Sequence, residues 1–254
     1  MRRIDLNADV GESFGAYTLG NDAALMASIT SANIAAGFHA GDPSVLRATI
    51  RLAKTHGVAI GAHPGFPDLV GFGRRELRVT PREAEDFILY QIAAVAGVAA
   101  AEGARLAHVK AHGALFNMAA RDRPLADALA RAVAAFDRSL RLFASPDSEM
   151  VNAARALGLP IAIEVFADRA YDADGQLASR QTPGAVIHDV DTVVARAVGL
   201  IADRTVVAVD GSRLHIDADT MCLHGDTPGS DRLAAAVRAG LEAAGIAVKA
   251  IGAP

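Results

Sequence analysis

The sequence is short of the residues that build disulfides and aromatic cores. Its 254 residues include one cysteine and no tryptophan, and aromatic residues make up only 5%. The single cysteine, Cys222, excludes an intrachain disulfide, which is usual for proteins of reducing compartments. With apolar residues at 52% and charged residues at 21%, the chain can bury a sizeable core. We therefore expect a folded protein with an aliphatic, alanine-rich core.

Long runs of one charge or of apolar residues are also missing. The net charge is −4 with both signs interspersed, and no stripe of Lys and Arg indicates nucleic-acid binding. The longest apolar stretches, such as 92–101, fall short of the roughly 20 residues that span a bilayer. No signal-peptide pattern follows Met1. We expect a cytoplasmic protein that binds neither nucleic acid nor membrane.

Short apolar runs alternate with longer helical patterns. The expected strands are 3–8, 31–37, 58–62, 106–112, 140–144, 161–166, 219–224 and a last one at 247–251. The expected helices are 21–29, 43–56, 81–102, 122–136, 147–157, 191–203 and 228–244. Repeated strand–helix units predict a parallel sheet, and so many units favour a closed barrel over a doubly wound open sheet. We therefore predict an α/β fold, a single seven-stranded (β/α) barrel-like domain over residues 1–254.

Helix-start signals follow several of these strands closely. Asp42-Pro43 offers an N-cap followed by a proline at the first helical position. Thr80-Pro81 does the same, with Glu83 placed for a capping box, and Thr227-Pro228 repeats the pattern. These signals locate the loops between strands and helices, where α/β folds usually hold their functional sites.

The expected strands have an aliphatic face and a polar face, because successive strand side chains point to opposite sides. The polar face carries Asp5, Asn7, Asp9, His108, Lys110, Glu164, Cys222, His224 and Asp226. In a barrel this face is the interior, so Asp5, Asn7, Lys110, Glu164 and His224 are expected to converge near one end. Buried charge is costly unless it is paired. A polar set of this size therefore favours a functional site over packing.

Histidines recur where strands are expected to end. His39, His63, His112 and His224 follow four different strands, and glycines beside them allow a close approach of the backbone to a ligand. A lone strand histidine is usually a satisfied core residue, but four at matching ends predict a shared site. Asp42, in contrast, is expected to serve as the N-cap of the next helix.

The polar residue types allow acid–base chemistry and anion binding. Lys110 can stabilise an oxyanion or a phosphate, or act as an acid or base if burial lowers its pKa. Asp5 and Glu164 are candidates for general base and general acid. The histidines can transfer protons or bind a substrate carboxylate.

Two loops contain glycine, proline and arginine. They span 64–80 and 167–190, and loops of this length are often lids or binding segments. Arg74, Arg75 and Arg169 lie on them, and arginine suits bidentate binding of a carboxylate or phosphate. A solvated surface role is the competing interpretation for each arginine.

Metal, thiolate and nucleotide motifs are weak or absent. Asp and His at strand ends suit a divalent ion, but no H-E-x-x-H motif is present, and His108 and His112 lie four apart on a strand rather than on a helix. A divalent metal is therefore left open. Nothing marks Cys222 as a thiolate, and there is no G-x-S-x-G. No G-x-x-x-x-G-K-[ST] loop is present, so ATP would need an unusual site or another protein.

Six motifs, in this order, connect the chain to a known family. They are DLNADVGESFG (5–15), NIAAGFHAGDP (33–43), GAHPGFPDLVGFGRR (61–75), VKAHGALFN (109–117), EVFADRAY (164–171) and CLHGDTPG (222–229). With them the chain resembles, over essentially its whole length, the LamB/YcsF family of 5-oxoprolinase A subunits. Family members commonly carry Cys where this chain has Ala8 and Ala36, which argues against an essential thiol at either position.

The resemblance implies a barrel-like fold related to the sugar deacetylases. It also implies ATP-dependent opening of the 5-oxoproline lactam to L-glutamate, together with two partner subunits of the B and C type; a homo-oligomer is left open. In that reaction Asp5 or Glu164 would orient water, Lys110 would stabilise the oxyanion or phosphate, and His112 or His224 would protonate the ring nitrogen. The expected substrate-binding residues are Asn7, Asp9, His39, His63, Arg74, Arg169 and Asp226.

Two other functions compete with this interpretation. The first is a stand-alone, metal-dependent amidohydrolase or deacetylase, which would require a metal and no ATP. The second is a non-catalytic subunit that binds substrate and delivers it to its partners. The convergence of acid, base and cation on one face argues against binding alone.

Overall fold

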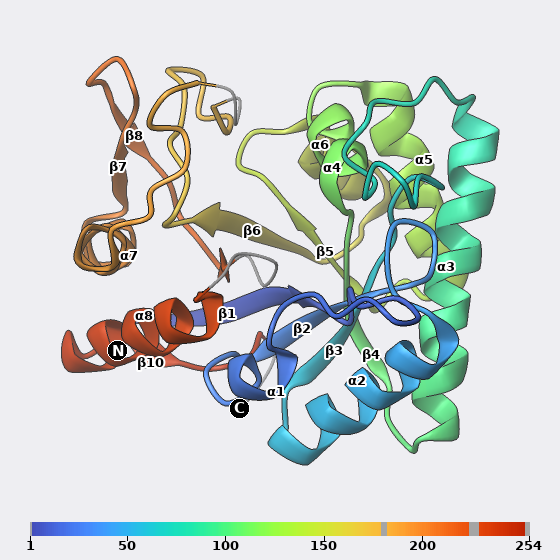
Figure 1. Cartoon of the computed structure of the whole chain (residues 1–254). Helices are drawn as coiled ribbons and strands as arrows, with labels where there is room; N and C mark the ends of the chain where they lie inside the picture. The colour runs from blue at the N-terminus through green and yellow to red at the C-terminus, as the bar shows by residue number, and fades with distance from the viewer. Residues whose placement is uncertain (1, 179–181, 224–228, 252–254) are drawn as a thin grey trace.

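Seven parallel strands close into a barrel in the computed structural model, which describes residues 2–178, 182–223 and 229–251. The ring consists of β1 (Arg3–Val10), β2 (Ser31–Ala35), β3 (Ala59–His63), β4 (Leu106–Lys110), β5 (Arg141–Ala144), β6 (Ile161–Phe166) and β9 (Thr220–Leu223). Each strand pairs with the next in this order, and β9 pairs back to β1. This closure confirms the predicted seven-stranded barrel and excludes the open sheet (Figure 1).

The short strand β10 (Ala247–Val248) corresponds to the expected last strand. It pairs in parallel with the start of β1, where Arg3 lies opposite Ala247. Strand β9 pairs with β1 only from Asp5 onward. The two strands therefore share one edge of β1, and β10 lies outside the ring.

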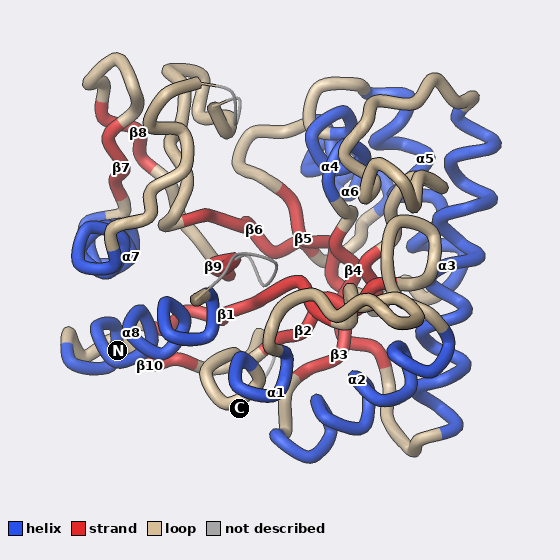
Figure 2. The backbone as a smooth tube through the Cα atoms, in the orientation of Figure 1, coloured by secondary structure: helices blue, strands red, loops and turns tan. Residues whose placement is uncertain are grey.

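Helices cover the outside of the barrel (Figure 2). They are α1 (Asp22–Leu25), α2 (Pro43–His56), α3 (Pro81–Ala101), α4 (Gly113–Ala119), α5 (Arg123–Phe136), α6 (Glu149–Leu157), α7 (Val190–Asp203) and α8 (Ser230–Ala243). Asp42 caps α2 through the amides of Ser44 and Val45, and Thr80 and Glu83 form the predicted capping box of α3. Thr227-Pro228 lies outside the described residues.

The sequence misplaced some boundaries. The expected helix over 21–29 is a single turn, and the expected strand over 106–112 ends at Lys110. His112 is instead the N-cap residue of α4, a seven-residue helix that the sequence analysis missed. An antiparallel hairpin, β7 (Thr205–Val207) with β8 (Arg213–His215), was also missed, because its three-residue strands are too short to show a period.

The two faces of the strands differ as predicted. Ile4, Leu6 and Ala8 belong to the aliphatic core that lies between strands and helices. Asp5 and Asn7 point the other way and are equally buried, at 1% and 0% exposure. Both faces of β1 are thus shielded from water, and its polar side chains fill the barrel interior.

Helix α3 is long and apolar enough to cross a membrane by length and composition alone. It packs in the structure against α5 and β3. Residues such as Ile88, Ile92 and Val95, three or four positions apart, are fully buried on the side of the helix that faces the barrel. One side of this apolar helix is therefore part of the packing around the barrel.

Candidate active site

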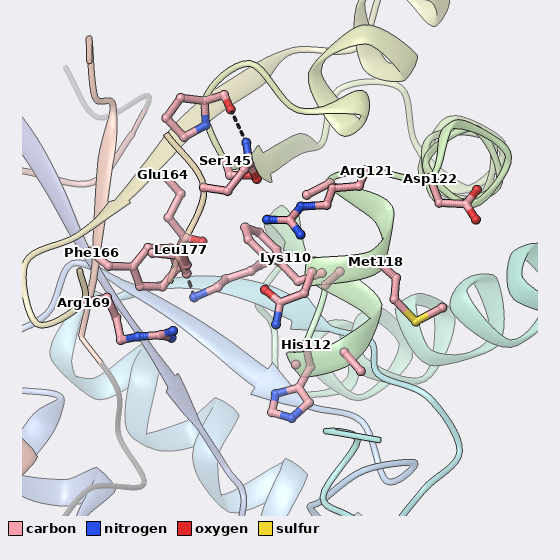
Figure 3. Close-up of a pocket in the computed structure, with 18 of the residues that line it drawn as sticks. Lys110, His112, Met118, Arg121, Asp122, Ser145, Glu164, Phe166, Arg169 and Leu177 are labelled. Atoms are coloured by element: carbon pink, nitrogen blue, oxygen red, sulfur yellow. Dashed lines mark hydrogen bonds and ion pairs between the residues drawn. The ribbon is translucent and has the colours of Figure 1, made fainter. Parts of the chain in front are cut away.

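A cavity of about 1080 Å³ opens where the strands end at their carboxyl termini. Its walls come from the ends of β1, β3, β4 and β6, from α4, and from the loops after β3 and β6 (Figure 3). The predicted site residues among its lining are Asp9, His63, Arg74, Lys110, His112, Glu164 and Arg169. The carboxyl ends of parallel barrel strands are the usual position of an active site.

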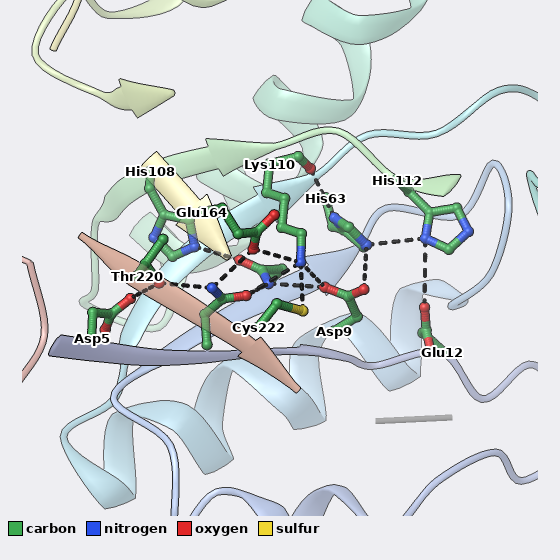
Figure 4. Close-up of polar contacts among 12 residues, drawn as sticks. Asp5, Asp9, Glu12, His63, His108, Lys110, His112, Glu164, Thr220 and Cys222 are labelled. Carbon is green, nitrogen blue, oxygen red and sulfur yellow. Dashed lines mark hydrogen bonds and ion pairs between the residues drawn. The ribbon is translucent and has the colours of Figure 1, made fainter. Parts of the chain in front are cut away.

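Lys110 lies at the floor of this cavity and contacts two carboxylates at once (Figure 4). Its Nζ is 2.9 Å from Glu164 Oε1 and 3.0 Å from Asp9 Oδ1. The same ammonium donates to Cys222 Sγ at 2.8 Å and to Asn7 Oδ1 at 3.3 Å. Three strands besides β4 therefore fix its position.

The protonation of these groups follows from burial and from their mutual charges. Burial alone lowers the pKa of Lys110, but the carboxylates of Asp9 and Glu164 and the hydrogen bond to Cys222 outweigh it, and the pKa lies well above its ordinary value. Burial raises the pKa of the Cys222 thiol well above its usual range, so the sulfur stays protonated. Burial also raises the pKa of the Glu164 carboxyl. Lys110 is thus a cation, and Glu164 gains a proton more readily than an exposed carboxylate does.

Glu164 has one oxygen available for a ligand. Oε1 accepts hydrogen bonds from Asn7 and Lys110. Oε2 is buried without a hydrogen-bond partner among the described residues, although Glu164 lines the cavity. A buried carboxyl oxygen of this kind needs a partner to offset its lost hydration. A bound water or substrate in the cavity can supply that partner.

A layer of amides supports the floor. The Asn7 side-chain amide donates to Glu164 and to Thr220, and its oxygen accepts from Asn33. Asn33 in turn contacts His108 Nε2 at 2.7 Å through its oxygen. Burial holds the pKa of His108 at about 3, so this ring is neutral. Asn7 therefore orients Glu164 from within the barrel. It is not one of the described residues that line the cavity.

Asp5 lies one layer deeper than the sequence analysis expected. Its carboxylate accepts hydrogen bonds from the hydroxyls of Thr30, Ser31 and Thr220. Burial raises its pKa, which the three hydroxyls oppose. It is not part of the cavity lining. Asp5 holds Asn7 in place through Thr220. It was expected to lie beside Lys110 and Glu164, but it is connected to them only through Thr220 and Asn7.

Three of the predicted histidines meet at the rim of the cavity. His39, His63 and His112 come together with Glu12, and one ligand atom from each lies within 4.8 Å of all the others. The His39 and His112 rings stack with their centroids 3.8 Å apart. All four side chains are buried. We refer to these four residues as the rim cluster.

Glu12 was missed by the sequence analysis. It lies two residues beyond the end of β1, after Gly11, where the two-residue period of the strand no longer applies. Its Oε1 is 3.8 Å from His112 Nδ1 and 3.9 Å from His39 Nε2. Only its place inside the motif DLNADVGESFG marks it in the sequence.

Two glycines make room for the buried rings. A Cβ at Gly61 would lie 2.0 Å from His108 Nε2, and a Cβ at Gly65 would lie 2.6 Å from His39 Nδ1. Real side chains do not approach so closely. These glycines therefore allow imidazoles, rather than a ligand, to approach the backbone.

The arginines have different surroundings. Arg169 is buried and donates to the carbonyls of Ala178 and Ala185, so it braces the loop after β6 while lining the cavity. Arg74 is exposed at the mouth, with its guanidinium 5.0 Å from the Phe72 ring centroid. Arg75 forms an ion pair with Asp68. His224 and Asp226 lie outside the described residues.

Comparison with known proteins gives consistent matches over nearly the whole chain. A model of the LamB/YcsF family matches residues 4–254. A relative from Bordetella pertussis, named as the A subunit of 5-oxoprolinase, is 53% identical over 97% of this chain and 98% of its own. A relative of the same name from Heliobacterium modesticaldum is 56% identical over 98% of each chain. The crystal structure of a lactam utilization protein from Thermus thermophilus has a TM-score of 0.94 at 47% identity, over 98% of this chain and 100% of that one.

Proposed function

Because the chain belongs to the LamB/YcsF family, we propose that it is the catalytic subunit of an ATP-dependent 5-oxoprolinase, which opens 5-oxoproline to L-glutamate. The names of its relatives support the substrate and a multi-subunit enzyme. The observation that carries the proposal is Lys110 between Asp9 and Glu164 at the cavity floor. A fixed cation beside an available carboxyl oxygen suits the hydrolysis of a stable amide.

The proposed reaction begins with activation of the lactam oxygen. Transfer of the γ-phosphoryl group of ATP to this oxygen releases ADP and leaves an electrophilic ring carbon. Water then adds to that carbon, the ring C–N bond breaks as the nitrogen gains a proton, and an acyl phosphate remains. A second water hydrolyses the acyl phosphate to L-glutamate and inorganic phosphate. Lys110 stabilises the negative charge that develops on the oxygen or the phosphate.

Glu164 is the residue that we assign to the proton transfers. Its Oε2 can accept the proton of the attacking water, and its raised pKa suits returning that proton to the ring nitrogen. The sequence offers Asp5 as an alternative base, but Asp5 is held by three hydroxyls below the cavity. The sequence also offers His112 as the acid, but both of its ring nitrogens already contact neighbours.

The cavity is much larger than a small lactam requires. Ligand pockets of about 300–1,000 Å³ hold drug-sized molecules, and this one has about 1080 Å³. Arg121 and Arg123, which the sequence analysis missed, join Arg74 and Arg169 in its lining. We propose that the lactam binds near Lys110 and that ATP phosphates enter beside Arg121 and Arg123, with the nucleotide shared with B- and C-type partner subunits in the cytoplasm.

The first experiment measures glutamate release from 5-oxoproline with and without ATP. The chain is assayed alone and mixed with its candidate partner subunits. We expect ATP-dependent release in the mixture only. Lys110→Met and Glu164→Gln should lose this release while still assembling with the partners, and Lys54→Met, at an exposed lysine, should keep it. Full activity of both site variants would refute the assigned roles.

A metal-dependent hydrolase that acts alone is the second candidate function. The observation in its favour is the rim cluster, whose residue types bind divalent metals. In the same assay it would release product from the isolated chain without ATP, and a chelator would stop that release. A non-catalytic substrate-binding subunit would instead leave the activity of the mixture insensitive to Lys110→Met.

A further inference from the structure

We propose that the rim cluster is a binding site for one divalent transition-metal ion, with Glu12, His39, His63 and His112 as its protein ligands. The proposal rests on the geometry of these four side chains, and it holds whether or not the chain is a 5-oxoprolinase. A His₃Glu donor set is borderline in softness, so it suits Zn²⁺ and neighbouring first-row metals rather than Mg²⁺ or Ca²⁺.

Backbone carbonyls fix which nitrogens can bind a metal. His63 Nδ1 lies 2.8 Å from the carbonyl oxygen of Lys110, and His112 Nε2 lies 2.8 Å from that of Phe72. A carbonyl oxygen can only accept a hydrogen bond, so each of these nitrogens carries the hydrogen. His63 Nε2 and His112 Nδ1 therefore present lone pairs. Contacts of this kind orient the histidine ligands of metal sites.

The two lone pairs face each other. His63 Nε2 and His112 Nδ1 are 3.0 Å apart. Two acceptor nitrogens at this distance repel each other unless a cation lies beside them. Two nitrogens that bind the same ion at about 2.0–2.1 Å lie roughly 3.0–3.4 Å apart at the usual coordination angles. A cation next to both nitrogens therefore explains a contact that the protein groups alone leave unfavourable.

His39 provides an independent indication. It is 1% exposed, and neither ring nitrogen has a hydrogen-bond partner in the described part of the chain. Buried polar atoms are nearly always satisfied. Its Nε2 lies 3.9 Å from Glu12 Oε1, which is itself 3.8 Å from His112 Nδ1. The unpartnered ring is thus held against the other three ligands, and Gly65 leaves the space that this position needs.

The position of the site links it to the cavity. Of the four, His63 and His112 are among the described residues that line the cavity, and Glu12 and His39 are not. Asp9 Oδ2 is 3.4 Å from His63 Nε2, while Asp9 Oδ1 binds Lys110. An ion in the rim cluster would therefore neighbour the carboxylate that holds Lys110.

The test is a titration of the whole, chelator-treated chain with Co²⁺, followed by its visible absorption bands and then by displacement with Zn²⁺. We expect one Co²⁺ per chain. Glu12→Gln and His39→Gln should each weaken binding by more than about 100-fold, because even outer-shell partners contribute 10–100-fold. His56→Gln, at an exposed histidine on α2, should bind like the wild type.

Thermal unfolding gives a second readout on the same samples. Zn²⁺ should raise the midpoint of the wild type and of His56→Gln, because a ligand that binds only the folded state stabilises it. It should leave the midpoint of Glu12→Gln unchanged. Because Glu12→Gln keeps all three imidazoles, it still provides the test if His39→Gln fails to fold. No stoichiometric Co²⁺ binding by the wild type, or wild-type affinity in folded Glu12→Gln, would overturn the proposal.

Discussion

The barrel floor and the rim cluster are both buried and polar, but their hydrogen bonding differs. At the floor, Lys110 bridges Asp9 and Glu164, and Asn7 contacts several neighbours. At the rim, His39 is unpartnered among the described residues. The comparison shows that burial alone does not identify a ligand site. Most polar atoms of the floor have hydrogen-bond partners within the protein, whereas at the rim the ring nitrogens of His39 have none among the described residues.

The largest effect is expected when the floor loses its cation. Lys110→Met leaves the buried Glu164 carboxylate and the partly buried Asp9 carboxylate without their ammonium. Breaking a buried ion pair in this way costs about 3–5 kcal/mol, which chemical denaturation would measure. If Lys110→Met has the same midpoint denaturant concentration as the wild type, the ion pairs of Lys110 do not stabilise the fold.

The double variant Lys110→Met/Glu164→Gln sharpens this test. It removes the positive charge together with one of the buried negative charges. We expect it to recover part of the lost stability, because the remaining cost is then the burial of Asp9 alone. No recovery would indicate that Glu164 is already neutral in the wild type.

The next effect concerns the packing under the floor. Gly61→Ala places a methyl group 2.0 Å from His108 Nε2, so the ring must move off Asn33. Overpacking of this kind costs about 1–3 kcal/mol. Gly97→Ala is the matched control, because a Cβ at this helical glycine meets no atom within 4 Å. Urea denaturation of both variants should show destabilisation only for Gly61→Ala.

An equivalent substitution at the rim should act on binding instead. Gly65→Ala places its methyl group 2.6 Å from His39 Nδ1 and displaces that ring from the rim cluster. We expect Co²⁺ affinity to fall by at least about tenfold, as for other changes behind a metal ligand. The denaturation midpoint without metal should change less than in Gly61→Ala. Equal effects on stability at both glycines would remove the contrast between floor and rim.

The smallest effect is expected at Cys222. Its thiol stays protonated, and its sulfur accepts one hydrogen bond from Lys110, which keeps its contacts with both carboxylates when this bond is lost. The hydroxyl of a serine at this position can accept the same hydrogen bond from the ammonium. Cys222→Ser should therefore keep glutamate release within about tenfold of the wild type. Complete loss of activity in this folded variant would instead indicate a thiol in the reaction.

The same contrast explains what the sequence could predict. The two-residue period of β1, β4 and β6 placed Asn7, Lys110 and Glu164 on one face, and the structure brings them together. That period ends with the strand. Glu12 lies beyond β1, and its direction depends on the loop, which no repeating pattern describes. Asp5 lies on the same strand face as Asn7. The two-residue period gives this face, but it does not give how far below the cavity the side chain lies.

The histidines mark the limit of strand-end reasoning. Their positions predicted that His39, His63 and His112 would gather, and they do. A metal was left open from the sequence because the chain has no H-E-x-x-H spacing on a helix. The rim cluster is assembled from four separate segments of the chain, so no local spacing encodes it. Helix α4, which begins right after His112, was missed for a similar reason, since its start has no side-chain cap.

The closure of the ring between β1 and β9 also has a kinetic consequence. Asp5 pairs with Thr220, and the two are separated by most of the chain. Contacts of such long sequence separation form slowly. During synthesis, the β1 edge and the floor network stay incomplete until Thr220 has emerged from the ribosome. Until then the nascent chain presents an unpaired strand edge, which is open to wrong pairing with other chains.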